Sequence, residues 1–534
     1  MVLQSIRRFV LGQTSQSSNY PTNPTDTILP VYYFDDTPLL RNYVQCSTLR
    51  FNDVLDAEML KESLSRVIAL PGWRKLGGRV RMNVSTLVKA LIMFSDIRQD
   101  KGKLEIHIPQ AFNSERPAIG FHYDTVDVGI DEHPVASKLP KPTPEQPSIQ
   151  DQHPEFTTLG VPAGTPRCLD DYLKSDHPQL TLHVVSFTDA TLVSICWPHI
   201  AVDGISLGHI GYAWSLSLAG RMSEIPPMLS AGDDPMATAG NDPVFTQSHP
   251  LEKQQVTGWR MYIFVLYYVF DLIWWRTIES KAVFLPGGYA KQLRRTALDF
   301  LGEDHPDLFV SESDTIVAWL AIMVTSALFP KGSNRPLTIG NAYDLRGRAP
   351  SLFPDQGAYI QNAVFPCWTI IPATTIHNRD DSTIGSIASA VRGSIQEQTT
   401  ETSIHAQARL TRDALELSGV PPLFGDANQF TVHFASVRAD LAEALDFSPA
   451  IIKHGSHDKD IWVSSSGHPV YYHIQCISPN NMLARNYSLI SRTSSGDYWI
   501  HGNYPTEVWK TMESMLLTLK TAIGPTSRDA ESSL

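Results

Sequence analysis

A histidine and an aspartate four positions apart are the residues of this sequence whose types are best suited to catalysis. They are His199 and Asp203, in the segment 197–204 with the sequence WPHIAVDG. A neutral imidazole can accept a proton from a reacting group, and a carboxylate one helical turn later can lock the histidine in place. The spacing alone indicates little. The chain has 18 histidines, and aspartate fills roughly one position in twenty of an average protein, so about one match is expected by chance.

The chain contains three such matches, and the surrounding sequence distinguishes them. His377 and Asp381 lie in a hydrophilic cluster, whereas His454 and Asp458 lie in a polar run that contains glycine. Both contexts are typical of solvated turns. Only the match at His199 has surroundings that predict a fixed catalytic loop.

The residues around this match predict a strand that ends at the histidine and a helix that begins after the aspartate. Residues 182–187 alternate like a strand, and residues 191–197 form a second apolar, β-branched run, which together predict a hairpin that delivers His199 at its end. Gly204 can adopt backbone angles that a side chain forbids. Apolar residues at helical spacing then predict a helix over 205–218.

Length and composition bound the class of protein. A chain of 534 residues is too long for one core and predicts two domains. A formal net charge of −12, without a local Lys/Arg run, argues against non-specific nucleic-acid binding. Five scattered cysteines show neither zinc spacing nor a disulfide framework, so we expect no metal site and reduced thiols in a cytoplasmic protein. The N-terminus does not resemble a secretory signal.

Strand-like and helix-like runs alternate in both halves of the chain, which predicts a two-domain α/β protein. We expect an N-terminal domain over 1–225, a connection over 226–285 and a C-terminal domain over 286–534. A Pro- and Gln-rich stretch over 138–166 predicts a surface loop. The expected helices are 289–298 and 313–328, the second with Ser311 or Ser313 as N-cap. The expected strands of the second half are 337–342, 364–371, 429–434, 470–477 and 487–490.

The segment from Trp259 to Trp275 is almost wholly apolar and aromatic. It falls short of the ~20 residues needed to cross a bilayer, and a charge such as Asp271 inside a membrane would cost about 2.5–3.5 kcal/mol. A buried or interdomain helix is the favoured interpretation. A peripheral membrane contact, for example at the endoplasmic reticulum, and a true span are the alternatives.

Several motifs in order resemble the BAHD acyltransferases, in particular the fungal branch that includes the trichothecene O-acetyltransferases. The motifs are HIAVDG at 199–204, the segment 60–65 followed by the Gly-Arg turn at 76–79, the segment 311–319, and the segment 341–348 followed by the segment 361–364. The resemblance covers roughly residues 30 to 520. It departs from the family at the Asp-Phe-Gly-Trp-Gly loop, which should fall at 463–469 and retains only its second glycine and the following proline. Residues 446–448 are a rival placement.

The resemblance implies two similar mixed-sheet domains of the chloramphenicol-acetyltransferase type, with an active-site channel at their interface. It implies acyl transfer, by default acetyl, from acyl-coenzyme A to a hydroxyl of a specialised metabolite such as a terpenoid or polyketide. His199 would be the general base, while Asp203, Gly204 and Arg346 would support its loop, with Asp203 turned from the histidine toward Arg346. No bound cofactor, metal or covalent nucleophile is required, and a monomer is expected. The coenzyme A contacts stay unassigned.

Three alternatives overlap these residues. Gly204, Ser206 and Gly208 match the Gly-x-Ser-x-Gly elbow of serine hydrolases, although the elbow needs a strand that ends just before its first glycine. A condensation-type domain shares the ancestral fold, but normally has a histidine where this chain has Pro198. A non-catalytic binding protein that kept the fold is the third alternative.

Overall fold

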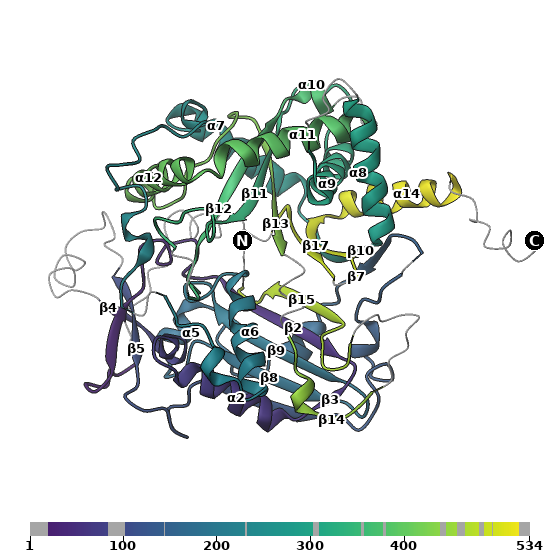
Figure 1. Cartoon of the computed structure of the whole chain (residues 1–534). Coiled ribbons are helices and arrows are strands. Elements are labelled where there is room, and N and C mark those ends of the chain that lie inside the picture. The colour runs from purple at the N-terminus through teal and green to yellow at the C-terminus, as the bar shows by residue number, and fades with distance from the viewer. Residues whose placement is uncertain are drawn as a thin grey trace, which may run out of the picture.

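The computed structural model of the chain describes residues 20–522, apart from residues 84–101, 144, 230–231, 303–308, 354–356, 377–380, 438–444, 456–464, 480–484 and 494. Two mixed β-sheets with helices packed against them form two halves, drawn below and above one another in Figure 1. The predicted α/β class with two mixed-sheet halves is confirmed.

The lower sheet has five strands in the order β15-β2-β9-β8-β6. It is mixed, because β6 and β8 run parallel whereas the other neighbours run antiparallel. Its strands are β2 (Val44–Phe51), β6 (Gly120–Thr125), β8 (Thr181–Ser186), β9 (Thr191–Pro198) and β15 (Tyr471–Cys476). Strand β9 lies in the middle of this sheet, so its end is a rigid place from which to present a side chain.

The upper sheet has seven strands in the order β12-β11-β13-β16-β17-β10-β7. Its strands are β7 (Ser148–Asp151), β10 (Ile278–Leu285), β11 (Leu337–Asp344), β12 (Val364–Ile371), β13 (Phe430–Val437), β16 (Tyr487–Arg492) and β17 (Tyr498–Pro505). Strands β11, β13 and β16 run parallel, and the remaining pairs run antiparallel. Two smaller sheets join β1 (Thr27–Pro30), β4 (Arg79–Asn83) and β5 (Lys103–Ile108), and β3 (Val54–Leu55) with β14 (Ile451–Lys453).

Helices cover one face of each large sheet. In the lower half, α2 (Ala57–Ala69) and α6 (Ser206–Leu218) pack together on the sheet. In the upper half, α8 (Gly287–Leu301), α9 (Glu312–Leu328), α11 (Asp381–Gln398) and α14 (Thr506–Ala522) form one layer. The remaining helices are α4 (Phe156–Gly160), α5 (Leu169–Leu173), α7 (Trp259–Trp274), α10 (Ala373–Ile376) and α12 (Glu401–Ser418). Short 3-10 helices occupy Trp73–Gly77, Ala136–Lys138, Met222–Glu224, Pro235–Thr238, Glu252–Gln254 and Ser448–Ala450.

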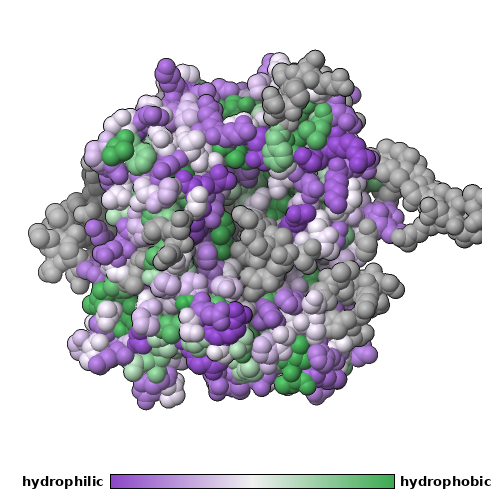
Figure 2. All heavy atoms as spheres, in the orientation of Figure 1, coloured by the Kyte–Doolittle hydropathy of each residue, from purple (hydrophilic) through white to green (hydrophobic). Residues whose placement is uncertain are grey.

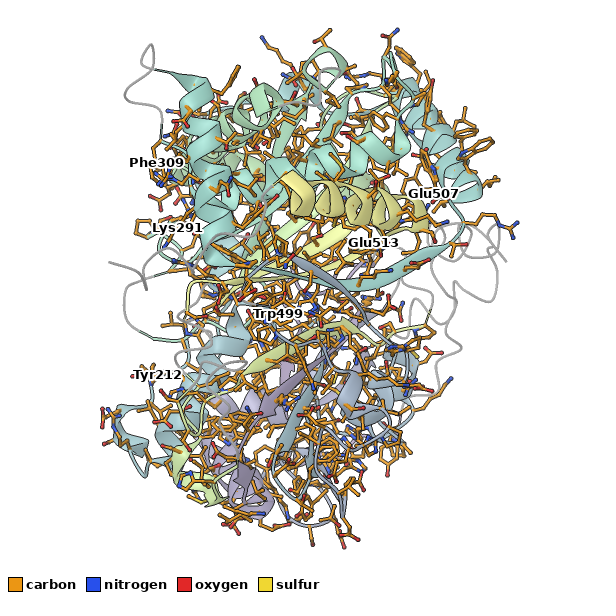
Figure 3. All side chains as sticks on the ribbon, turned by 90° about the vertical axis from the view of Figure 1, so that its right-hand side faces the viewer. Tyr212, Lys291, Phe309, Trp499, Glu507 and Glu513 are labelled. Atoms are coloured by element: carbon orange, nitrogen blue, oxygen red, sulfur yellow. The ribbon has the colours of Figure 1, made fainter. Side chains whose placement is uncertain are left out.

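Each large sheet takes one strand from the other half of the sequence. Strand β7 pairs with β10 of the upper sheet, and β15 pairs with β2 of the lower sheet. The two sheets meet near Trp499 of β17, which lies between the halves in Figure 3 and packs edge-on against Tyr471 of β15 with ring centroids 5.1 Å apart. The predicted surface loop over 138–166 is therefore wrong in part, because β7 and α4 lie within it.

The hairpin and the helix predicted around His199 are confirmed. The hairpin forms from β8 and β9 with an antiparallel register, and α6 begins at Ser206. Helix α9 has Ser311 as its N-cap, and Ser311 and Asp314 form a reciprocal capping box that satisfies backbone donors of the first turn. The predicted strands of the second half are present as β11, β12, β13, β15 and β16, with ends shifted by up to three residues.

The favoured interpretation of the apolar segment is wrong. The segment forms α7, but that helix lies on the surface with Asp271 as its only buried residue. The physical reason is that Asp271 faces the protein, where Arg335 donates two hydrogen bonds to it at 2.7 and 2.6 Å. Searching the described residues for a helix long and apolar enough to cross a membrane yields none.

Candidate active site

His199 follows β9 directly and its backbone is held from both halves of the molecule. Its N–H donates to the carbonyl oxygen of Tyr43 at 2.7 Å. Its carbonyl oxygen accepts from Nδ2 of Asn362 at 2.8 Å. Tyr43 immediately precedes β2 of the lower sheet, whereas Asn362 precedes β12 of the upper sheet. The histidine backbone therefore bridges the two sheets.

The imidazole of His199 is suited to accept a proton. Burial lowers the pKa of His199 below its ordinary value, although the nearby Asp203 carboxylate and the hydrogen bond from Asn362 act in the opposite direction. The ring is therefore neutral at pH 7. Its Nδ1 is buried and has no hydrogen-bond partner in the described part of the chain. The Tyr43 ring lies beside it, with centroids 5.1 Å apart.

Asp203 does not hydrogen-bond to His199 but holds the turn that follows it. One carboxylate oxygen accepts from the backbone N and the Oγ of Ser206 at 2.8 and 2.7 Å. The other accepts from Nη2 of Arg346 at 2.9 Å and from the backbone N of Ala363 at 3.1 Å. Burial raises the pKa of Asp203, but Arg346 and these hydrogen bonds lower it by more. The carboxylate is therefore charged in the folded protein.

Arg346 joins the loop of His199 and Asp203 to the upper half. It follows β11, and besides Asp203 its guanidinium donates to the carbonyl oxygens of Tyr359 and Gln361 at 2.8 and 2.6 Å. It also donates to Asp344 at 2.7 Å. Although burial lowers the pKa of Arg346, the two carboxylates raise it by more, so it stays charged. The pairing of Asp203 with Arg346 that the resemblance implies is therefore present, across 143 positions of sequence.

Asn362 and Asp35 complete the support of the loop, and neither was proposed as a site residue from the sequence. Asp35 is buried and accepts from the backbone N and Nδ2 of Asn362 at 2.9 and 2.7 Å. The same Nδ2 holds the His199 carbonyl. Burial raises the pKa of Asp35, and the buried cation of Lys75 opposes that change. The segment 361–364 of the family motif was the available signal for Asn362, whereas the sequence offers no signal for Asp35.

A small cavity lies behind the histidine loop. Its lining includes Ile200 and Ala201 of the loop together with Asp35, Lys75 and Gln361. The Nζ of Lys75 lies 3.7 Å from the centroid of the Tyr32 ring and has no hydrogen-bond partner among the described residues. Burial lowers the pKa of Lys75. The cavity behind the loop is therefore mixed in character, because the apolar side chains of Val31, Leu76, Ile106 and Ile360 line it together with these polar groups.

The Gly-x-Ser-x-Gly match does not form a nucleophile elbow. Strand β9 ends at Pro198, and Ser206 is fully buried at the first position of α6. Its Oγ donates to Asp203 and accepts from Arg346 at 2.8 Å. Among the described residues no histidine hydrogen-bonds to it. Ser206 is therefore part of the support of the loop.

Gly204 does not use the backbone freedom predicted for it, because its φ lies outside the left-handed region. A Cβ built at this position would meet nothing within 4 Å. The glycine therefore leaves open space directly beside Asp203, one turn from the histidine.

The two placements considered for the divergent family loop lie together in space. The backbone N of Phe447 donates to the carbonyl oxygen of Gly467 at 2.8 Å, and both segments contact the lower half. Phe447 is buried and stacks on Phe51 with ring centroids 5.2 Å apart, and Gly467 donates to Asp53 at 2.8 Å. Residues 463 and 464 lie outside the described residues. The printed contacts of Phe447 and Gly467 tie both segments to β2 and the residues that follow it.

The other two histidine–aspartate matches do not form comparable sites where they can be seen. His377 lies outside the described residues, as does the side chain of Asp381. His454 has a side chain that is 73% exposed and lies 3.4 Å from Asp53, while Asp458 is outside the described residues. No group of three or more potential metal ligands gathers within the described ranges.

Relatives along almost the whole chain include fungal proteins named as acyl-transfer enzymes. The chain is 33% identical over 511 residues to the O-acetyltransferase PaAT-2 of Phomopsis amygdali, covering 93% of this chain and 99% of the relative. It is 31% identical over 505 residues to the acetyltransferase pyiB of Pyricularia grisea, covering 93% and 94%. A relative from Penicillium decumbens, 32% identical over 500 residues and covering 93% and 96%, carries the name transcriptional regulator calD. No family model matches the chain.

Solved structures share the fold at much lower identity. F. graminearum TRI101 in complex with coenzyme A and T-2 mycotoxin has a TM-score of 0.60 at 12% identity, covering 92% of this chain and 97% of that one. Vinorine synthase has a TM-score of 0.53 at 15% identity, covering 94% and 95%. Because relatives more than 30% identical span the same length, the chain belongs to the BAHD-type acyltransferases of fungi, which use acyl-coenzyme A as the acyl donor.

Proposed function

We propose that this enzyme transfers an acetyl group from acetyl-coenzyme A to a hydroxyl of a specialised metabolite, with His199 as the general base. The observation that carries the proposal is a neutral imidazole directly after the central strand β9, on a loop fixed by the ion pair of Asp203 with Arg346. A terpenoid or polyketide alcohol is the proposed acceptor class. The O-acetyltransferase name of one relative supports a hydroxyl as the acceptor group.

The reaction needs one base and no covalent intermediate. As the acceptor oxygen attacks the thioester carbonyl, its proton moves to the imidazole of His199. The carbon–sulfur bond then breaks, coenzyme A leaves as the thiolate, and the imidazolium returns the proton to that sulfur. Such general-base assistance gives typically ~10²–10⁴-fold in rate. Donor and acceptor would reach His199 through a channel between the two halves.

Asp203 has a supporting role in this proposal. Its four hydrogen bonds all go to Ser206, Arg346 and Ala363, so it has no free lone pair aimed at the imidazole. It fixes the turn after the histidine. Asn362 fixes the histidine carbonyl itself. The imidazole can then stay in place while its charge changes, which is the requirement for a base that is used twice.

A serine hydrolase is the alternative that the sequence left open, and the contacts of Ser206 argue against it. A nucleophilic hydroxyl must be accessible and paired with a base, whereas the Oγ of Ser206 is buried between Asp203 and Arg346. The second alternative is a non-catalytic protein of the same fold, which the name transcriptional regulator of the calD relative would fit. The acetyltransferase names of other relatives of similar identity and coverage favour a catalytic role.

The test is mass spectrometry of a panel of hydroxylated terpenoids and polyketides incubated with acetyl-coenzyme A and the purified full chain. We expect a mass gain of one acetyl group with the wild type and its loss with His199→Ala. Ser206→Ala is the matched variant for the hydrolase alternative. We expect a serine-directed fluorophosphonate probe to label neither the wild type nor this variant above background. Equal product from His199→Ala would reject the histidine as base, and labelling of Ser206 would favour the hydrolase.

A further inference from the structure

The polarity of α7 is inverted relative to an ordinary surface helix. Its single buried residue is Asp271, which forms a two-pronged ion pair with Arg335 at 2.6 Å. Near its first turn, Nη2 of Arg260 donates to the carbonyl oxygen of Gly425 at 2.6 Å. Arg485 donates to the backbone oxygens of Asp271 and Trp275 at the C-terminal end. Polar contacts therefore help to hold the helix on the protein, and the apolar residues that point outward are left for another surface.

The outward face of α7 is wholly apolar or aromatic. Its residues are between 41% and 76% exposed and are Trp259, Tyr262, Val265, Leu266, Tyr267, Phe270, Ile273 and Trp274. Neither charged residue of the helix lies on this face, because Arg260 and Asp271 both turn inward. On the face of the molecule drawn in Figure 2, apolar residues form small patches among hydrophilic ones. A contiguous exposed apolar surface of this size on a folded protein marks an interaction site.

We propose that this face of α7 inserts into the boundary between headgroups and acyl chains of a lipid bilayer. At about 100° per residue the outward residues span about 200° of the helix circumference. A flat rigid partner covers only one side of such a ridge, whereas a fluid bilayer adapts to its whole outward surface. Tryptophan at both ends and aromatic residues between are typical of interfacial helices.

The length of α7 fits a helix that lies in the plane of the interface. Its 16 residues extend about 24 Å at ~1.5 Å per residue, less than the ~30 Å of a hydrocarbon core. The ion pair of Asp271 with Arg335 stays on the protein side, so no charge enters the lipid. The enzyme would remain a folded protein attached at one ridge.

Charge predicts the kind of bilayer. The chain carries a formal net charge of −12, and the outward face of α7 has no Lys or Arg to attract anionic headgroups. Attachment would depend on apolar burial, so it would occur on neutral phosphatidylcholine and would resist salt.

The experiment is flotation of the purified full chain with phosphatidylcholine vesicles, at low and high salt. The test variant is Tyr262→Ser/Leu266→Ser/Phe270→Ser. The matched control is Val244→Ser/Leu417→Ser/Ile452→Ser, which removes three exposed apolar residues elsewhere, each at least 65% exposed. Burial of each large apolar side chain favours lipid roughly tenfold or more, so we expect the test variant to bind at least ~100-fold more weakly and the control to bind like the wild type.

Three outcomes would overturn the proposal. They are absence of wild-type flotation with phosphatidylcholine, flotation that requires anionic lipid and disappears in salt, and equal binding by the test variant. The competing explanation is that a second copy of this chain covers the face, and sedimentation without lipid tests it. A dimer that forms with the wild type and the control but not with the test variant would assign the face to that second copy. Thermal midpoints of both variants should match the wild type. Should the triple variant fail to fold, Leu266→Glu alone serves as the second variant with the same expected loss.

Discussion

Replacement of Asp203 by asparagine tests whether the ion pair with Arg346 holds the catalytic loop. The carboxylate accepts two hydrogen bonds at each oxygen, and the amide of asparagine can accept at one oxygen only. If the amide nitrogen replaces the oxygen that faces Arg346 and Ala363, it meets two buried donors. If it replaces the other oxygen, it meets the backbone N–H of Ser206, whose hydroxyl can turn to accept from it. Breaking a buried ion pair costs about 3–5 kcal/mol. Because Arg346 keeps Asp344 as a partner, we expect a loss near the lower limit, about 3 kcal/mol.

Thermal unfolding followed by circular dichroism measures this loss. For a large domain about 3 kcal/mol corresponds to a midpoint lowered by at least ~5 °C. The matched control is Asp344→Asn, which removes the other carboxylate from the same guanidinium but at a side chain that is 30% exposed. We expect no more than about 1 kcal/mol for it. An unchanged midpoint for Asp203→Asn, or an equal loss in the control, would refute the supporting role of the ion pair.

Three further predictions follow from the same geometry. Because burial lowers the pKa of His199 and the neutral ring is the active form, kcat/KM should be flat above pH ~6.5 and fall only in more acid solution; a limb above pH 7 would contradict this. Asn362→Ala removes the Nδ2 that donates to both the His199 carbonyl and Asp35 and should lower kcat at least ~10-fold. A kcat of the variant equal to that of the wild type would exclude a positioning role for Asn362. His473 and His501 lie buried between the sheets with ring centroids 5.2 Å apart, and burial lowers the pKa of His473 to about 4. As the pH falls, this imidazole is therefore protonated in the unfolded chain before it is protonated in the folded protein. The free energy of unfolding should accordingly fall by about 3 kcal/mol between pH ~6.5 and pH 4 because of this group. Chemical denaturation across pH should show a smaller fall for His473→Gln, and an identical fall would contradict the assignment.

The parts of the fold that local sequence could predict are those whose partners lie nearby. The hairpin of β8 and β9 has a strand-like pattern in each arm and a short turn between, so its end at His199 was predictable. The N-cap of α9 was predictable because Ser311 and Asp314 satisfy the first turn within four residues.

The parts that could not be predicted depend on partners far away in sequence. Strand β7 lies in a Pro-rich stretch and exists because β10 offers it an edge. Asn362 and Asp35 are 327 positions apart. The apolar composition of α7 predicted burial, and its inversion depends on Arg335, 64 positions from Asp271. The pair of Asp203 with Arg346 was expected only through the family resemblance.

The most direct test of the central claim is the single-turnover rate of acetyl transfer by His199→Ala and by the wild type, with an acceptor from the panel. Acetyl-coenzyme A affinity is measured in parallel by calorimetry. We predict that the single-turnover rate of the variant is lowered by ~10²–10⁴-fold. The affinity for acetyl-coenzyme A should stay within about threefold of the wild type, because the variant loses a base rather than a binding surface. An unchanged rate at unchanged donor affinity would show that the proton leaves the acceptor by another route.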